Sequence, residues 1–291
     1  MPYLYLICSV FFMSSPSVFG AFYNRKSTEK KDAPALYSFI YLFTVFLGWA
    51  LLFTFAPSFD WRVLPYALAF GAFYTVCQIG NINALKIGPT ALTSLMLQLS
   101  LIAVTAWGFF FWNSKFTWLV GAGLVLVALA LWLCLYTGKQ KDKDSKKISL
   151  KWLLFALMAL IGNAGCSIVQ KNQQMKFDGE HGNMLMLFAT GISTVFCLVR
   201  YLQSDKTDGK EILKKAAPFP IVAGGCNVLL NLFVMLLATS TISPSLIYPV
   251  LAVGGLAITS VFSAVVFKER LDWWQWLGIA VGAVAVTLLS L

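Results

Sequence analysis

The sequence predicts an all-α polytopic membrane protein, with ten transmembrane helices arranged as two inverted five-helix repeats. Hydrophobic residues make up 59% of the 291 residues and charged residues only 12%, whereas roughly 25% are charged in a typical soluble domain. The charged residues gather in short polar stretches. The apolar segments between these stretches are near the ~20 residues that a helix needs to cross the hydrocarbon core of a bilayer.

Ten segments of this kind follow one another along the chain, with short loops between them. The first lacks the basic residues that precede the apolar run of a signal peptide, so we expect it to be a retained helix. The predicted spans cover residues 3–22, 35–56, 63–84, 89–111, 117–137, 151–171, 183–202, 217–238, 243–267 and 272–291.

A basic linker at residues 138–150 divides the chain into a first repeat, 1–137, and a second repeat, 151–291. Each repeat holds five spans. An odd number of spans places the two repeats in opposite orientations, as in many secondary transporters. Short echoes support the division, since Pro89 opens the fourth span and Pro244 opens the ninth.

The distribution of basic residues predicts the orientation in the membrane. Eighteen of the 22 Lys and Arg residues fall on one side of the predicted topology, and four fall on the other: Arg62, Lys115, Lys171 and Lys176. Cytoplasmic loops carry an excess of Lys and Arg. We therefore expect a multi-pass protein of the inner or plasma membrane with both termini outside. The net charge of +10 is explained by these loops and does not indicate nucleic-acid binding.

The junction of the ninth and tenth spans resembles a family signature. Phe267-Lys268-Glu269-Arg270-Leu271 precedes Gln275-Trp276-Leu277-Gly278, which is similar to the "GE-R…Q…G" pattern of the drug/metabolite transporter superfamily, EamA-like branch. Lys268 stands where the family usually has glycine. The resemblance implies ten spans and a cavity lined by spans one to four and six to nine. It also implies cytoplasmic termini, whereas the charge count indicates the opposite.

Polar residues near the middle of spans are candidates for substrate binding, because a polar group in lipid needs a protein or water partner. The sequence places Asn163 at an expected glycine break (Gly162–Gly165) of the sixth span, and Asn227 and Asn231 on one face of the eighth. The predicted substrate-binding residues are Asn163, Asn227, Asn231, Gln78, Asn81, Gln98, Tyr248 and Trp49. For each of them, packing between helices is the alternative.

The chemistry that the spans lack limits the function. No Asp or Glu lies inside a span, since Asp272 only opens the tenth, although a proton-coupled cation exporter usually needs a carboxylate within the membrane. Glu269 lies at a span end, where we expect a salt-bridged helix terminus between Lys268 and Arg270. His181, the single histidine, lies in a loop and is expected to be solvated. No pattern indicates a cofactor, a metal site or a catalytic group.

The sequence therefore favours a secondary transporter of a small neutral or zwitterionic metabolite, amino acid-like or otherwise, that works by alternating access. Export of quaternary or lipophilic cations is the alternative within transport, and the aromatic face of Trp49, Tyr74 or Tyr248 would bind the cation. A membrane-embedded enzyme or a lipid scaffold would be a different class, and both are disfavoured. Spans five and ten are nearly free of polar residues and are expected at the periphery, as packing helices or as a homodimer interface.

Overall fold

The computed structural model describes residues 2–27, 32–112, 117–135, 149–204, 213, 215–238, 244–269 and 271–290. All regular elements within these residues are helical, so the predicted all-α class is confirmed. The first half contributes α1 (Pro2–Lys26), α2 (Ala33–Phe55), a 3-10 turn η1 (Trp61–Val63), α3 (Leu64–Ile87), α4 (Thr90–Gln98), α5 (Leu101–Phe111) and α6 (Trp118–Leu135). The second half contributes α7 (Leu150–Lys176), α8 (Gly182–Leu202), α10 (Pro218–Ala238), α11 (Pro244–Val261), the π-helical turn η3 (Phe262–Val266) and α12 (Trp273–Ser290).

Each of these helices lies on one of the predicted segments, but the break in the bundle is not where we expected it. The segment 89–111 is interrupted by a turn at Leu99 and Ser100, which separates α4 from α5. Helix α7, in contrast, runs without interruption through Gly162–Gly165. The expected break of the sixth span is therefore wrong.

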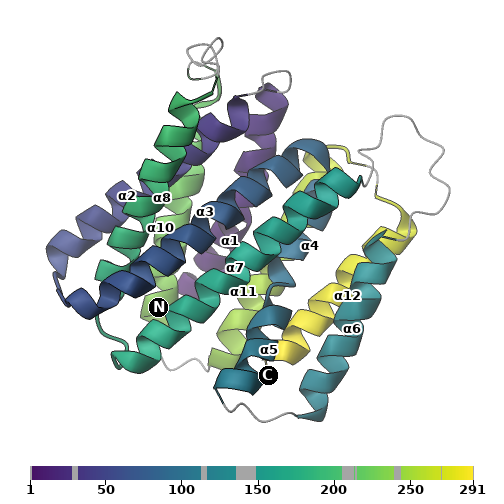
Figure 1. The fold of residues 1–291 in the computed structure, drawn as a ribbon. Helices are drawn as coiled ribbons and strands as arrows, with labels where there is room; N and C mark the ends of the chain where they lie inside the picture. Colours follow the sequence, from purple (N-terminus) through teal and green to yellow (C-terminus); the bar gives the residue numbers. More distant parts are fainter. Residues whose placement is uncertain are drawn as a thin grey trace.

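The glycines of α7 allow close packing instead of breaking the helix. A Cβ atom at Gly162 would lie 2.5 Å from the backbone nitrogen of Cys77 in α3, and one at Gly80 of α3 would lie 2.6 Å from the backbone nitrogen of Ala159 in α7. Small residues let helix backbones approach each other in a membrane. Helices α3 and α7 accordingly lie side by side through the middle of the bundle (Figure 1).

The other helices pack in pairs around this centre. Helix α1 lies along α10, α2 pairs with α8, and α6 pairs with α12. Figure 1 shows the pair α2–α8 at one edge of the molecule and the pair α6–α12 at the opposite edge. Helices α4 and α11 contact each other between these edges, and α11 also packs against α1 and α12.

Within the described residues, five helices are long and apolar enough to cross a membrane, and these spans are Tyr3–Lys26, Ala33–Phe55, Trp61–Ile87, Leu150–Lys176 and Gly182–Leu202. Shorter apolar helical stretches are found at Gly121–Ala130, Pro218–Val234, Val250–Val266 and Trp273–Leu288. The chain is thus a helical bundle of the multi-pass membrane type.

The bundle has two chemically different ends. We name the end where α1 and α3 finish and α7 begins, which holds Lys26, Lys86 and Lys151, the basic end. Arg62 and Lys176 lie at the opposite end. In the view of Figure 1 both chain termini lie toward this opposite end, in the lower part of the picture.

Candidate functional site

Three polar side chains of α3 share one face of that helix. Tyr74, Gln78 and Asn81 are spaced at i, i+4 and i+7, which places them one above another. All three belong to the part of α3 that is packed inside the bundle, since Gln78 and Asn81 are 4% and 5% exposed. The sequence named Tyr74 only as an aromatic face for a cation, and this spacing places it beside the predicted amides.

A hydrogen-bonded network connects this face to α2 and α10. The hydroxyl of Tyr74 donates to Asn227 Oδ1 over 3.3 Å, and Asn231 Nδ2 donates to the carbonyl oxygen of Asn227 over 2.8 Å. The hydroxyls of Tyr41 and Tyr74 lie 3.3 Å apart. The predicted pair Asn227 and Asn231 is therefore linked to α3 through Tyr74, which lies one turn before Gln78. Tyr41 was not predicted, because a tyrosine within a span also fits simple packing.

Asn163 of α7 bonds to the turn that separates α4 from α5. Its Nδ2 donates to Ser100 Oγ over 2.8 Å and to the carbonyl oxygen of Leu97 over 3.3 Å. Backbone groups at an interrupted membrane helix need such partners. The amide of Asn163 is thus already engaged, and it stabilises the turn between two helices.

These groups lie at a similar depth in the bundle. Gln78 and Gln98 are each about ten residues from the Gly88–Pro89 turn that joins α3 to α4, which at 1.5 Å per residue is roughly 15 Å. Asn163 follows Gly162, which touches Cys77, the neighbour of Gln78. We name this set the polar layer, and its members are Tyr41, Tyr74, Gln78, Asn81, Gln98, Asn163, Asn227 and Asn231.

Several buried polar groups have no hydrogen-bond partner within the described residues. Asn81 Oδ1 and Trp49 Nε1 are unpartnered. The side chains of Gln78 and Gln98, which is 8% exposed, likewise make no hydrogen bond in the described part of the chain. Buried polar groups in folded proteins are hydrogen-bonded in roughly 90% of cases or more. Trp107 Nε1, Gln173 Oε1 and His181 Nδ1 are unpartnered as well, so missing partners are not confined to the predicted site residues. Within the polar layer, Gln78, Asn81 and Gln98 are the groups to which water or a ligand would supply the missing partners.

Two predicted residues, Trp49 and Tyr248, do not belong to the polar layer. Trp49 of α2 is 1% exposed and packs in an apolar cluster with Val63, Ala67 and Phe70, so only its indole nitrogen is available to a polar partner. Tyr248 lies in α11, and its side chain is outside the residues that the structure describes.

Glu269 forms a salt bridge at a helix end, as expected, and Arg25 of α1 is a partner that the sequence did not predict. Its Oε1 lies 3.0 Å from a guanidinium nitrogen of Arg25 at the end of α1. Lys268 adopts a backbone φ of +52° in the left-handed region, which turns the chain sharply before Glu269. Arg270 is outside the described residues.

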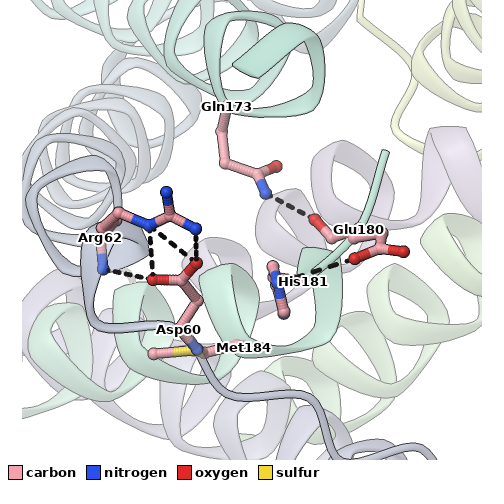
Figure 2. Close-up of polar contacts among 6 residues, drawn as sticks. All are labelled: Asp60, Arg62, Gln173, Glu180, His181 and Met184. Carbon is pink, nitrogen blue, oxygen red and sulfur yellow. Dashed lines mark hydrogen bonds and ion pairs between the residues drawn. The ribbon is translucent and has the colours of Figure 1, made fainter. Parts of the chain in front are cut away.

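The opposite end of the bundle carries a second group of polar contacts, shown in Figure 2. Asp60 accepts hydrogen bonds from the side chain and the backbone N–H of Arg62, and these hold the pKa of Asp60 at about 2. The pair therefore stays ionised throughout the physiological pH range. Gln173 Nε2 donates to the backbone oxygen of Glu180 over 2.7 Å.

His181 belongs to the same group and is not solvated as expected. Its side chain is 17% exposed and packs edge-on against the ring of Phe177, with Nε2 3.8 Å from a carboxylate oxygen of Glu180. The backbone N–H of Asp60 points to the sulfur of Met184 at 3.2 Å. These contacts join the loop before α3 to the loop before α8, and they contain no member of the polar layer.

A groove of about 500 Å³ lies between α2 and α8, away from the polar layer. Its lining residues are Phe46, Leu187, Phe188, Gly191, Ile192 and Val195. None of them can form a side-chain hydrogen bond. This surface is typical of a helix pair that faces lipid, and it offers nothing to orient a polar substrate.

Comparison with known proteins bears on the second half of the chain. Residues 150–291 match the model of the EamA-like transporter family, which confirms the resemblance noted at Glu269. No curated protein matches the chain in sequence. A solved structure described as "Crystal structure of protein" is 10% identical, with a TM-score of 0.59 over 99% of this chain and 95% of that chain. At this identity the likeness shows a shared fold only.

Proposed function

We propose that this chain is a secondary transporter of a small neutral or zwitterionic metabolite. Its residues 150–291 match the EamA-like transporter family. One observation carries the proposal: buried amides without partners lie within a bundle whose described helices contain no Asp or Glu. Amides offer two donors and an acceptor but no charge. Such a site suits hydroxyl, amide, or paired ammonium and carboxylate groups.

The packing of the helices supports transport by alternating access between two inverted halves, 1–137 and 151–291, joined by the linker 138–150. In the two halves α1 corresponds to α7, α2 to α8, α3 to α10 and α6 to α12. The packing of α3 against α7 therefore has its counterpart in the packing of α10 against α1, and the pairs α2–α8 and α6–α12 each join two corresponding helices. An arrangement of this kind lets two similar halves rock against each other around a central site. Transport by this fold needs no catalytic group, so we do not expect enzymatic activity.

The two ends of the bundle differ in how tightly they are packed, which supports a state open at one end. Helix α1 packs against α3 and α4 near the basic end. In the second half, the corresponding contacts would join α7 to α10 and α7 to α11. No comparable packing of these helices is found in the described part of the chain. We infer that the structure is closed at the basic end, which we propose to be cytoplasmic, with both termini outside.

Thermal stabilisation of the purified protein by a panel of metabolites tests the proposal. A ligand at 100 times its Kd that binds only the folded state adds about 2.7 kcal/mol to the free energy of unfolding. We expect neutral or zwitterionic compounds to raise the melting temperature. Stabilisation by tetraalkylammonium or lipophilic cations alone would favour the cation exporter, for which the rings of Tyr41 and Tyr74 are the supporting feature.

From the scarcity of polar residues in spans five and ten, which form α6 and α12, we propose a homodimer through these two helices. Within the chain these two helices pack against each other, and Gly282 of α12 contacts Leu95 of α4. Gly282 is therefore used in a contact inside one chain. Mass measurement of the protein in lipid nanodiscs would show whether a dimer forms.

A further inference from the structure

The carboxylate of Glu269 makes several hydrogen bonds that join different helices at the basic end. Its Oε1 accepts from Arg25 at 3.0 Å and from Thr90 Oγ1 at 2.9 Å. Its Oε2 accepts from the backbone N–H of Thr90 at 2.7 Å and from Ser263 Oγ at 2.6 Å. The side chain is 7% exposed. We name Arg25, Thr90, Ser263 and Glu269 the Glu269 cluster.

The cluster connects the two halves of the chain. Arg25 ends α1 and Thr90 begins α4, both in the first half, whereas Ser263 and Glu269 follow α11 in the second half. A carboxylate is favoured beside the N–H groups at a helix N-terminus, and hydrogen bonds to a charged acceptor are stronger than neutral ones. The contacts across the halves are therefore among the strongest polar contacts described at this end.

Apolar and aromatic contacts close the same end around the cluster. The guanidinium of Arg25 lies 4.5 Å from the centre of the Phe267 ring, and Phe22 packs edge-on against that ring at 4.8 Å. Asn24, the residue before Arg25, donates through Nδ2 to the backbone oxygen of Ile82 in α3 over 3.0 Å. The end of α1 is thus held to α3, α4 and the end of α11.

At the opposite end, a similar contact between a cation and an aromatic ring joins the end of α5 to α7. Trp112, at the end of α5, precedes Phe267 by the same offset of 155 residues that separates Pro89 from Pro244. Lys171 of α7 lies 4.1 Å from the centre of the Trp112 ring, and Trp112 Nε1 donates to Asn172 Oδ1 over 2.7 Å. Each end therefore has a cation from α1 or α7 over an aromatic ring.

The position of Glu269 has no acidic counterpart in the first half of the chain. The residue that precedes Glu269 by 155 positions is Ser114, which lies outside the described residues, so the comparison rests on the sequence. Serine has no charge to pair with a cation or to accept several strong hydrogen bonds. The two halves thus share an aromatic contact but differ by one carboxylate.

We propose that the Glu269 cluster is a gate that keeps the basic end closed and biases the two alternating conformations toward the state closed at that end. The inference rests on the proposed alternating-access function. Opening the basic end requires the second half to move away from α1 and α4, so the bonds of Glu269 to Arg25 and Thr90 must break. The opposite end, which has no such carboxylate, opens more easily.

Hydrogen exchange of the full-length protein in nanodiscs, followed by mass spectrometry, tests the gate directly. Glu269→Gln keeps the shape of the side chain and removes its charge. Losing charge-assisted bonds of this kind weakens closure about ten-fold or more, so exchange in residues 20–26, 87–92 and 262–269 should accelerate by about that factor. Exchange in residues 171–176, at the opposite end, should stay unchanged.

Glu180→Gln is the matched control, because it makes the same change in an exposed acid at the opposite end. It should leave exchange at the basic end unaltered. If Glu269→Gln does not fold, Arg25→Gln, which spares the bonds to Thr90 and Ser263, should accelerate exchange at the basic end alone by a few-fold. Acceleration at both ends would indicate general destabilisation and would overturn the gate, as would unchanged exchange in a folded variant.

The experiment separates the gate from the proposed function. If end-selective exchange is found but no metabolite stabilises the wild-type protein, the gate stands and the substrate class fails. If metabolites stabilise the wild type but Glu269→Gln exchanges like the wild type, the transporter stands and the gate is wrong.

Discussion

Gln78 and Asn163 are both amides of the polar layer, but their surroundings differ. Gln78 is buried and makes no hydrogen bond within the described residues, whereas Asn163 donates to Ser100 and Leu97. A buried polar group without a partner lowers the free energy of unfolding by roughly 1–3 kcal/mol. Removing the partner of a hydrogen-bonded buried group lowers it by a similar amount. The same kind of substitution should therefore have opposite effects on stability at the two positions.

For Gln78→Met we expect an equal or higher melting temperature without substrate, since an unpartnered amide is replaced by an apolar side chain of similar size. Substrate affinity should fall about five-fold or more, because a ligand hydrogen bond of about 1 kcal/mol is lost. Melting temperature and substrate affinity of the purified variant measure both effects. A lower melting temperature with unchanged affinity would show that Gln78 is structural.

For Asn163→Ala we expect a loss of about 1–3 kcal/mol in the free energy of unfolding, since the turn between α4 and α5 loses its partner. The measurement is denaturation in detergent. A five-fold drop in affinity in the surviving folded protein would place the Asn163 amide in the substrate site as well. A stable variant with normal affinity would contradict both roles.

Lys268 provides a test of backbone strain. It has a φ of +52°, where a residue with a side chain is strained and glycine is not. We expect Lys268→Gly to raise the free energy of unfolding by about 0.5–1 kcal/mol. Lys151→Gly in the first turn of α7 is the control, and it should lower stability by up to about 1 kcal/mol. Equal effects at both positions would refute the strain at Lys268.

At the scale of the element, the contact of α3 with α7 depends on glycine. A Cβ at Gly162 would lie 2.5 Å from Cys77 N and 2.7 Å from the carbonyl oxygen of Phe73. Backbone atoms cannot move aside as a flexible side chain can, so Gly162→Ala should lower stability by about 1–3 kcal/mol or more, as overpacking does. The melting temperature and the yield of folded protein report this loss.

Gly225→Ala in α10 is the matched control, because nothing lies within 4 Å of a Cβ placed there. Alanine has a higher helix propensity than glycine, and the variant should gain up to about 1 kcal/mol. If Gly162→Ala behaves like Gly225→Ala, the two helices pack less closely than the structure shows.

The interruption at Leu99 and Ser100 is an element-scale feature that the sequence did not predict. The segment 89–111 reads as one apolar helix, and it has no glycine or proline at this point. The turn is held from outside by Asn163 of α7, which is 63 residues from Ser100. In contrast, the glycines of the sixth span were expected to mark a break, and they mark a helix contact instead.

At the scale of the whole molecule, the uneven distribution of basic residues predicts the orientation. With 18 of 22 Lys and Arg on one side, the positive-inside rule places the basic end in the cytoplasm. A reporter enzyme that is active only outside the cytoplasm should therefore be active when fused after Leu291. A reporter inserted in the linker 138–150 should be inactive there, and the reverse pattern would contradict the topology.

The sequence by itself determined the membrane class, the helical segments and the family resemblance of the second half. These depend on composition and on local runs of apolar residues, which report the solvent around a helix without any knowledge of its neighbours. It also identified the amides of the spans, because an Asn or Gln in lipid is unusual wherever it lies.

Only the tertiary structure decided what those residues contact. Whether an amide is engaged, as at Asn163, or unpartnered, as at Gln78, depends on which atoms of other helices come within about 3 Å. The bond of Glu269 to Arg25 joins residues 244 positions apart, and no local pattern encodes such a distance. The physical reason is that apolar composition determines that helices enter the membrane, whereas close packing of particular side chains determines how they meet.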